Sequence, residues 1–341
     1  MAFTPVKEII KEAPAFTQLT DLAAERLGGK VLYATDDFFA EKENLVKPGR
    51  GIFIADKYTD RGKWMDGWES RRKRTPGHDW AILQLTTPGK IIGFDIDTHF
   101  FLGNHPPHAS VEAVYINDAD PVKDWDNLEW KEILPKSYLD AGSQNFYTCV
   151  SDQLFTHIRL HIYPDGGVAR FRVYGEVFKN WDVVSADEEI DLAAAVNGGN
   201  AIACNDMFFS AMGNLIMPGR GVNMGDGWET KRNRTPGNRD WVILRLAKQG
   251  SLKRIIADTC HFKGNYPDSF SVEGCTSAND ADVLNDKVNW QTILAAQKLS
   301  ADHEHEYVNE VTANTGITHV RLNIFPDGGI SRLRLFGNIN K

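Results

Sequence analysis

One short segment concentrates the carboxylates and guanidinium groups of the first half of the chain. It runs from Asp66 to Asp79 and includes Gly67, Trp68, Glu69, Arg72 and Arg74. A guanidinium group binds a carboxylate in bidentate fashion and stays charged at any working pH. We therefore expect this segment to bind a small organic anion. Arg72 would anchor the anion, and Glu69 and Asp66 would serve as general acid and base.

The same segment recurs 160 residues later as Asp226-Gly227-Trp228-Glu229, followed by Arg232 and Arg234. The second copy predicts Glu229 and Asp226 as catalytic residues, and Arg232 as a substrate-binding residue. Trp68 and Trp228 are the candidate aromatic contacts to a substrate. A structural alternative stays open for either copy, because a buried tryptophan with ion pairs could simply hold a long loop against the sandwich edge.

A second polar cluster follows a predicted strand in each half. The first copy holds Asp97, His99, Gly103, Asn104 and His105, and the second holds Asp258, His261, Gly264 and Asn265. A loop glycine lets a ligand approach the backbone, and histidine exchanges protons near neutral pH. We expect Asn104, Asn265 and His105 to contact substrate, with His261 as an alternative proton carrier.

The two copies differ in their histidines, since His105 corresponds to Tyr266 and Phe100 to His261. Glu112 and Glu273 lie in alternating strand patterns that turn them away from the core, and solvated glutamate is the favoured interpretation. Metal-site, dinucleotide and serine-nucleophile signatures are weak or missing. We expect no cofactor, and assistance by a divalent metal stays open.

Strands must position these loops, because the apolar pattern alternates with a period of two. Residues 157–162 and 319–324 alternate strictly, and each run is followed by Pro-Asp-Gly-Gly and a second alternating run. This arrangement predicts a hairpin in each half. Further strands are expected at Trp80–Leu85, Ile91–Asp97 and Ser110–Ile116, and short helices at Leu19–Leu27 and Ile190–Val196. The chain is therefore an all-β sandwich, of either jelly-roll or immunoglobulin type.

The repeat organises the whole chain, and its length fits a duplicated domain rather than a solenoid unit. Upstream matches are 170 residues apart, which indicates an insertion in the first copy around Phe53 to Trp64. We place the first domain at residues 1–180, the second at 187–341, and a linker near Phe178 to Asp187. A chain of 341 residues with 42% hydrophobic residues can form two cores.

The charge and the cysteines limit the partners and the compartment. The net charge of −8 disfavours nucleic acid and anionic membranes as partners. The N-terminal segment, Met1 to Ala15, lacks the apolar core of a signal peptide, so we expect a soluble, cytoplasmic protein. The four cysteines, Cys149, Cys204, Cys260 and Cys275, show no paired spacing, which favours reduced and mostly buried thiols.

Taken together, the repeated segments resemble the allantoicase family over nearly the whole chain. The resemblance rests on Asp66 to Arg74 and Asp226 to Arg234, joined by the Pro-Gly-Arg-Gly, Gly-Asn and Pro-Asp-Gly-Gly elements. It implies a tandem repeat of two jelly-roll β-sandwich domains, galactose-binding-like in fold. It also implies an amidinohydrolase that splits allantoate into ureidoglycolate and urea, and a homo-oligomeric assembly.

A binding module without chemistry is the rival hypothesis. Jelly-roll sandwiches commonly carry carbohydrate sites, and Trp64, Trp68 and Trp228 could stack on sugar rings. Duplication would then increase avidity. Oligosaccharide binding without urea production would favour this tandem carbohydrate-binding protein.

Overall fold

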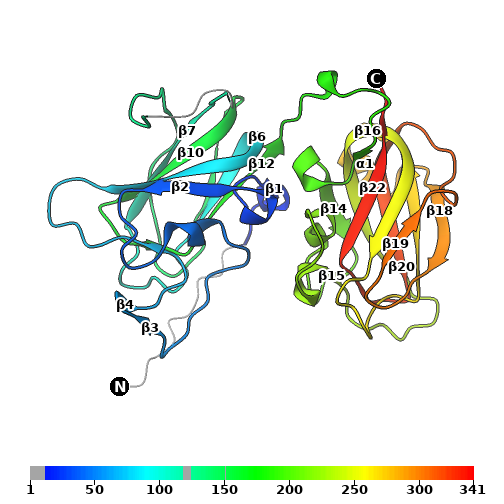
Figure 1. The fold of residues 1–341 in the computed structure, drawn as a ribbon, viewed down its shortest axis with the longest axis horizontal. Helices are drawn as coiled ribbons and strands as arrows, with labels where there is room; N and C mark the ends of the chain where they lie inside the picture. Colours follow the sequence, from blue (N-terminus) through cyan, green and yellow to red (C-terminus); the bar gives the residue numbers. More distant parts are fainter. Residues whose placement is uncertain (1–11, 118–123, 150) are drawn as a thin grey trace. The chain divides into compact units, whose positions relative to one another are not determined.

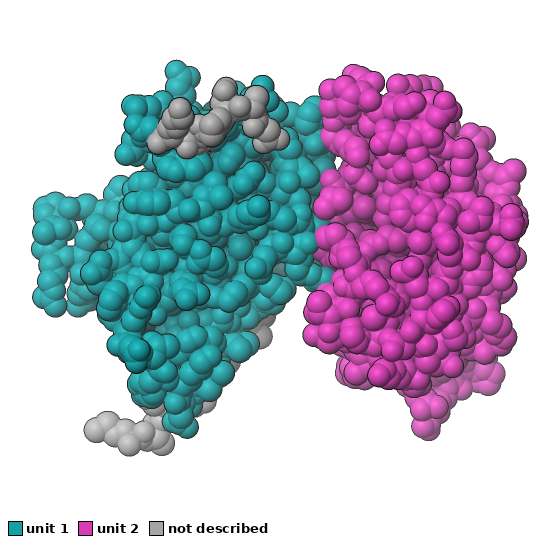
Figure 2. Space-filling view, viewed as in Figure 1, with its two compact units in different colours: residues 1–178 teal, residues 179–341 magenta. Residues whose placement is uncertain are grey.

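The computed structural model describes residues 12–117, 124–149 and 151–341. The chain divides into two compact units, residues 1–178 and 179–341, which Figure 2 colours separately. The segment before residue 12, which carries most of the expectation about a signal peptide, lies outside the described residues.

The first unit is built around one long strand, β6 (Asp79–Asp97), that belongs to two sheets (Figure 1). Its first half pairs with β2 and β10 and continues through β7 to β8. Its second half pairs with β12 and β9, and β12 pairs with β1. The partner strands are β1 (Thr20–Asp21), β2 (Lys30–Ala34), β7 (His108–Val114), β8 (Lys131–Tyr138), β9 (Phe146–Thr148), β10 (Leu154–Tyr163) and β12 (Arg170–Val177).

Apolar side chains of both sheets fill the space between them. Leu83 and Leu160 belong to the first sheet and Phe94 and Phe171 to the second, and all four are fully buried in one cluster. This arrangement is a β-sandwich, as predicted. Two strands were expected where β6 runs, but the chain passes from one sheet to the other without a break, because Thr86 to Gly89 stays extended.

The second unit repeats this topology, with β16 (Asp240–Asp258) as the strand shared by two sheets. Its partners are β13 (Ile190–Asp191), β14 (Asn200–Cys204), β17 (Ser269–Cys275), β18 (Gln291–Lys298), β19 (Glu304–Tyr307), β20 (Ile317–Phe325) and β22 (Arg332–Ile339). A single short α-helix, α1 (Asp280–Leu284), occurs within the part of the chain that the structure describes. The predicted tandem jelly-roll architecture is confirmed.

The predicted hairpins are wrong, although their strands form. β10 pairs with β6 and β7, whereas β12 pairs with β6 and β1, so the two strands flank β6 and do not pair with each other. The Pro-Asp-Gly-Gly connection leads into β11 (Gly167–Val168), which pairs with β5 (Trp68–Glu69), and β21 (Gly329–Ile330) pairs with β15 (Trp228–Glu229) in the second unit. Alternation predicts a strand, but it does not choose the partner of that strand.

The two predicted short helices are also wrong. Each segment begins with a two-residue strand, β1 or β13, and contains only one 3₁₀ turn, η2 (Glu25–Leu27) or η5 (Ala195–Asn197). Gly28 and Gly198 end these turns with φ values of 109° and 105°, a left-handed conformation that favours glycine. One turn is too short to nucleate an α-helix without tertiary support.

The remaining chain consists of short elements in the loops. In the first unit, η1 (Ala15–Gln18) and η3 (Lys42–Val46) are 3₁₀ turns, and the predicted insertion forms a small ribbon of β3 (Tyr58–Thr59) and β4 (Gly62–Lys63). In the second half of the chain, the 3₁₀ turns are η4 (Trp181–Val183), η6 (Met212–Ile216) and η7 (Met224–Asp226). The four cysteines are free thiols, and three of them are buried, as expected. None of the described helices has the length and apolar character needed to cross a bilayer.

Trp68 provides a test of how the site loop is held to the sandwich. Its side chain is fully buried, and its Nε1 donates a hydrogen bond of 2.8 Å to the carbonyl oxygen of Asp36. We expect Trp68→Ala to lower the free energy of unfolding by about 3–5 kcal/mol, because a large buried ring leaves a cavity. The measurement is chemical denaturation of the full chain followed by far-UV circular dichroism.

Trp64→Ala is the matched control. The Trp64 ring is half-buried and contacts the Lys57 ammonium group at 3.7 Å, so its removal should cost no more than about 1 kcal/mol. Equal losses for the two variants would contradict the structural role of Trp68.

Candidate functional site

The aspartates of the repeated segment are engaged in ion pairs with buried arginines. Asp66 Oδ2 accepts hydrogen bonds from Arg170 at 2.7 Å and from the Ile52 amide at 2.9 Å. In the second unit, Asp226 Oδ2 accepts from Arg332 at 2.8 Å and from the Val222 amide at 3.1 Å. One carboxylate oxygen of Asp66 and of Asp226 therefore holds loops together, and the acid–base role of these aspartates stays a prediction.

The tryptophans of the segment belong to the core. Trp68 and Trp228 are both fully buried, and Trp228 Nε1 donates to the Asp206 carbonyl oxygen at 2.8 Å. A ring without exposed surface cannot stack on a ligand. The prediction that Trp68 and Trp228 contact substrate or sugar is therefore wrong for this conformation, and the structural alternative accounts for the tryptophan of each segment.

Glutamate and asparagine from the two predicted clusters meet in both units. Glu69 Oε1 accepts a hydrogen bond of 2.7 Å from Asn104 Nδ2, and Glu229 Oε1 accepts one from Asn265 Nδ2. We call these two contacts the loop pairs. Burial raises the pKa of Glu69, and the hydrogen bond from Asn104 partly offsets that effect. A half-buried carboxyl group with a raised pKa is suited to proton transfer.

The backbone on each side of the loop pair explains its geometry. Glu69 pairs with Gly167 across β5 and β11, and with Ala40 on its other side. Gly67 is required by close packing rather than by a tight turn, because a Cβ atom there would lie 2.7 Å from both the Phe101 ring and the Val168 carbonyl oxygen. The equivalent glycine of the second unit, Gly227, meets Ile330 and Phe262 in the same way.

The predicted anchoring arginines lie on the surface. Arg72 and Arg232 are exposed, whereas the neighbouring Arg71 forms an ion pair of 2.6 Å with Asp36. Asp79 was expected beside guanidinium groups, but it is buried and accepts from Lys73 Nζ at 2.5 Å. Arg72 and Arg232 therefore remain available to a ligand. Among the described residues, neither arginine forms a direct hydrogen bond with a loop pair.

The two predicted histidines occupy different environments. Burial lowers the pKa of His105, which is half-buried on the loop after Asn104. His261 has a φ of 70°, its amide donates to Asp302 Oδ1 at 2.7 Å, and its Nε2 lies 2.8 Å from the Gly221 carbonyl oxygen. The proton-carrier role of His261 stays a prediction, and these contacts show that the imidazole also holds two loops together.

A titratable cluster in the first unit was not predicted from the sequence. Glu112 Oε2 accepts hydrogen bonds from Arg159 Nη2 at 2.6 Å and from His161 Nε2 at 3.0 Å, and His161 Nδ1 lies 2.8 Å from His78 Nε2. We call Glu112, Arg159, His161 and His78 the imidazole cluster. The alternation of β7 and β10 places the first three on the outward face, as expected for Glu112, but an ion pair replaces the expected free solvation.

The pKa values in this cluster follow from burial and pairing. Burial by itself raises the pKa of Glu112, but the hydrogen bonds from Arg159 and His161 outweigh it and lower the pKa. Burial lowers the pKa of His161 despite the attraction of Glu112. The spacing His157-x-Arg159-x-His161 on one strand was the signal that could have revealed the cluster, since residues two apart share a face.

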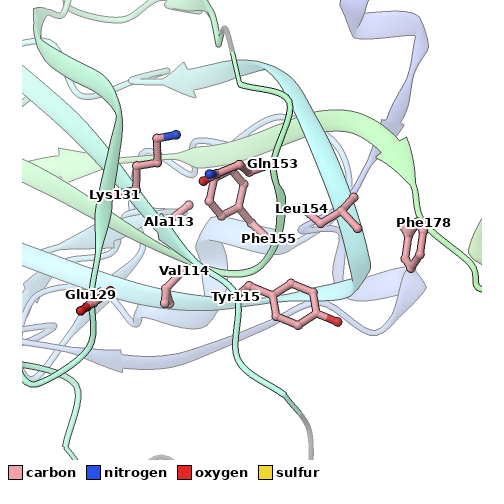
Figure 3. Close-up of a pocket in the computed structure, with 9 residues that line it drawn as sticks. All are labelled: Ala113, Val114, Tyr115, Glu129, Lys131, Gln153, Leu154, Phe155 and Phe178. Carbon is pink, nitrogen blue, oxygen red and sulfur yellow. The ribbon is translucent and has the colours of Figure 1, made fainter.

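An apolar hollow of the first unit lies away from the loop pair. It has a volume of about 560 Å³ and is lined by the far ends of β7 and β10, with Val114, Leu154, Phe155 and Phe178 on its wall (Figure 3). β7 begins and β10 ends near the loop pair, so this hollow occupies the opposite end of those strands. None of the candidate site residues lines it.

Within residues 12–117, 124–149 and 151–341, no group of three or more His, Cys, Asp or Glu side chains is placed to hold a metal ion. The expectation about cofactors and metal assistance stays a prediction.

The fold and these contacts define a duplicated jelly-roll protein with one polar loop pair in each unit. The family model for the allantoicase repeat matches residues 20–178 and 190–340, which covers both units. The chain belongs to the allantoicase family, and the resemblance seen in the sequence is confirmed.

Relatives and solved structures agree with this assignment. A probable allantoicase of Photobacterium profundum is 51% identical over 330 residues, which is 96% of this chain and 99% of that protein. A probable allantoicase of Pseudomonas fluorescens is 50% identical over 331 residues, again 96% of this chain and 99% of that protein. The crystal structure of allantoicase from Saccharomyces cerevisiae is 37% identical, covers 94% of this chain and 93% of its own, and has a TM-score of 0.81.

Glu69 gives the first unit a pH-dependent stability whose sign can be tested. A carboxyl group with a raised folded-state pKa stabilises fully below its unfolded pKa, and this contribution is lost as the pH rises through the folded pKa. We therefore expect Glu69→Gln to leave the melting temperature unchanged at acidic pH and to raise it, relative to wild type, at neutral pH. Thermal unfolding between about pH 4 and pH 8 provides the measurement.

Glu112→Gln is a control of opposite sign. The pKa of Glu112 is lowered in the folded state, so its contribution is present above the unfolded pKa and is lost as the pH falls. This variant should be less stable than wild type at neutral pH. If the melting temperatures of the two variants shift in the same direction relative to wild type at neutral pH, the burial of Glu69 does not govern its ionisation.

Proposed function

We propose that this chain hydrolyses allantoate to ureidoglycolate and urea. The observation that carries the proposal is the 51% identity to a probable allantoicase over 96% of this chain and 99% of the relative. Both units take part in that match, so the activity does not rest on a shared domain alone. The reaction classes that need a dinucleotide or a phosphate loop have no support in the sequence.

The substrate sets three chemical requirements. Allantoate carries one carboxylate and two ureido groups on a single carbon. The enzyme must hold the carboxylate, place a proton on the ureido nitrogen that leaves, and supply hydroxide from water to the carbon whose bond to nitrogen breaks. The proton lost by water balances the proton gained by urea, so the reaction needs no external oxidant or reductant.

The loop pairs supply the acid–base group of this proposal. Glu69 and Glu229 are both half-buried, and each accepts a hydrogen bond from an asparagine amide. The amide of Asn104 or Asn265 orients the carboxyl group and leaves its second oxygen for the substrate. Because burial raises the pKa of Glu69, a larger share of it is protonated, which suits protonation of the leaving nitrogen.

The exposed arginines supply the carboxylate anchor. Arg72 and Arg232 follow the two glutamates by three residues, on the same loops. A guanidinium group matches a carboxylate in bidentate geometry, whereas lysine would act only as a point charge. His105 and His261 lie on the loops that carry Asn104 and Asn265 and complete the proposed substrate surroundings. The homo-oligomeric assembly and the cytoplasmic location also stay proposals.

Substitution of each glutamate tests the acid–base assignment. We expect Glu69→Gln and Glu229→Gln to reduce kcat for urea release by about 10²- to 10⁴-fold in the unit that performs catalysis, because the proton donor is lost. Colorimetric urea measurement on purified protein provides the readout. Glu176→Gln, on an exposed position of β12, is the matched control and should keep wild-type turnover.

The two glutamate variants also identify the active unit. If only one variant loses activity, the loop pair of the other unit does not take part in catalysis and serves only as a scaffold. Wild-type turnover in both variants, with normal folding, would contradict the assignment of glutamate while leaving the urea-forming activity itself intact.

Arginine substitution tests the anchor separately from the chemistry. Arg72→Met or Arg232→Met should raise KM for allantoate by about 10- to 100-fold, because a hydrogen-bonded charge is worth roughly 1.5–3 kcal/mol. The kcat at saturating allantoate should change much less. Arg74→Met, on an exposed neighbour of the same loop, is the control. A loss confined to kcat would show that the arginine acts on the transition state instead.

A further inference from the structure

The two units differ in the imidazole cluster more than in the loop pairs. Strand register places Glu112 opposite Arg159 in the first unit and Glu273 opposite Arg321 in the second, so these positions correspond. Each glutamate forms an ion pair with its arginine, at 2.6 Å and 2.8 Å. The two units therefore share the carboxylate and the guanidinium group.

The two imidazole groups of this cluster have no histidine counterparts in the second unit. His161 corresponds to Asn323 and Tyr163 to Phe325, and the single residue His78 between Gly77 and Asp79 is replaced by two residues, Asn238 and Arg239, between Gly237 and Asp240. Asn323 Nδ2 donates to Glu273 Oε2 at 2.9 Å, which matches the 3.0 Å contact of His161 with Glu112. An asparagine thus supplies the hydrogen bond that the glutamate needs. The histidine of the first unit adds a capacity for proton transfer that the architecture does not require.

The charges near His78 change between the units in the same way. Lys73 corresponds to Asn233, since both backbone amides donate to the aspartate of the Pro-Asp-Gly-Gly turn, and Lys136 corresponds to Ala296. Lys136 Nζ lies 4.4 Å from the centre of the Tyr163 ring, which is itself 4.4 Å from the His78 ring. The first unit therefore places Lys73 and Lys136 near His78, where they would attract a carboxylate, whereas the second unit has Asn233 and Ala296 at these two positions and carries Arg239 directly before Asp240.

We propose that His78 is a proton-transferring catalytic residue of the first unit, held by His161 and Glu112 as positioning residues, and that the second unit does not perform this step. The inference rests on the proposed function and deepens it by assigning the base. His78 lies six residues after Arg72 on the loop that also contains Glu69 at its start. The segment from Glu69 to His78 then carries the proposed acid Glu69, the proposed anchor Arg72 and the proposed base His78.

The direction of the hydrogen bonds assigns the tautomers. Because the carboxylate of Glu112 only accepts, His161 carries its proton on Nε2, and its Nδ1 is an acceptor. His78 must then donate from Nε2 to His161 Nδ1, which leaves the lone pair of His78 on Nδ1. The basic nitrogen of His78 is thus its Nδ1. Protonation there strengthens the donation to His161 and, through it, to Glu112.

The proposed step balances its atoms and protons. His78 Nδ1 removes a proton from water, and the resulting hydroxide forms the new bond to the central carbon. The bond from that carbon to the ureido nitrogen breaks, and its electron pair stays on nitrogen, which receives the proton of Glu69. Proton return from His78 to Glu69 through solvent restores both residues. No redox partner takes part.

The surroundings of His78 decide its charge. The titratable and charged groups that face it are Lys73 and Asp79 on its own segment, His161, Arg159 and Tyr163 on β10, and Lys136 on β8, with Glu112 of β7 behind His161. Burial lowers the pKa of His78, Asp79 opposes this effect, and Lys73, Lys136 and Arg159 add to it. The imidazole is therefore neutral near neutral pH and ready to accept a proton.

The test replaces His78 by asparagine, which is polar and smaller and cannot act as a base. We expect His78→Asn to lower kcat for urea release by about 10²- to 10⁴-fold, with KM changed less than threefold. The reciprocal variant Asn238→His is the control and should keep wild-type kcat and KM. Melting temperatures of both variants check that the units remain folded.

A second variant separates a positioning role from a merely structural one. His161→Asn keeps the hydrogen bond to Glu112 but replaces the ring nitrogen that accepts from His78 by the oxygen of a shorter side chain, and the equivalent oxygen of Asn323 has no hydrogen-bond partner. We therefore expect kcat to fall by about tenfold and the acidic limb of the kcat/KM pH profile to shift. Added imidazole should restore part of the activity of His78→Ala, since a free base can fill the vacated space. Neither effect is expected from a loss of stability alone.

The outcomes distinguish the inference from the proposed function. If wild-type protein releases urea and His78→Asn keeps its kcat and pH profile, the inference is overturned and the proposed function stands. If wild-type protein releases no urea, the proposed function itself fails. A His78→Asn variant that melts as wild type, turns over slowly and responds to imidazole supports the inference.

Discussion

The buried ion pair between Asp66 and Arg170, with its counterpart of Asp226 and Arg332, is the interaction on which each site depends. The arginine lies at the start of a core strand, and the aspartate lies at the entrance of the segment that leads to the glutamate of the loop pair. The same aspartate also accepts an amide of the Pro-Gly-Arg-Gly loop. Three distant segments therefore meet at one charge. Removal of one partner from such a pair leaves the other buried and uncompensated, which costs about 3–5 kcal/mol.

A second pair of charges repeats this principle one strand away. Arg50 binds both oxygens of Asp97 at 2.9 Å and 3.0 Å, and Arg220 binds both oxygens of Asp258 at 2.9 Å and 2.8 Å. Asp97 and Asp258 end the long shared strand, so the guanidinium groups fasten the Pro-Gly-Arg-Gly loop to the place where the site begins. These contacts are nearly identical in the two units. The duplicated charges thus preserve the frame of the site rather than its chemistry.

The two units differ in titratable side chains that the conserved ion pairs do not require. Asparagine in the second unit supports Glu273 as well as histidine supports Glu112 in the first, so the ion pair with arginine tolerates either residue. Duplicated domains share one set of packing constraints, and groups outside those constraints are free to diverge. Lys73 and Lys136 of the first unit correspond to Asn233 and Ala296 of the second, at positions outside the buried core, where substitution costs little packing energy.

The sequence by itself determined the duplication, the β-sandwich class and the positions of most strands, because a period of two and a repeat are local patterns. It also placed Glu69 and Asn104, and Glu229 and Asn265, in clusters that the structure joins. Only the tertiary structure decided that β10 and β12 both pair with β6 and not with each other, that Trp68 belongs to the core, and that Asp66 pairs with Arg170. The pairing of His161 with Glu112 was decided in the same way. The choice of a partner 49 to 104 residues away depends on sheet register and burial, which no local pattern encodes.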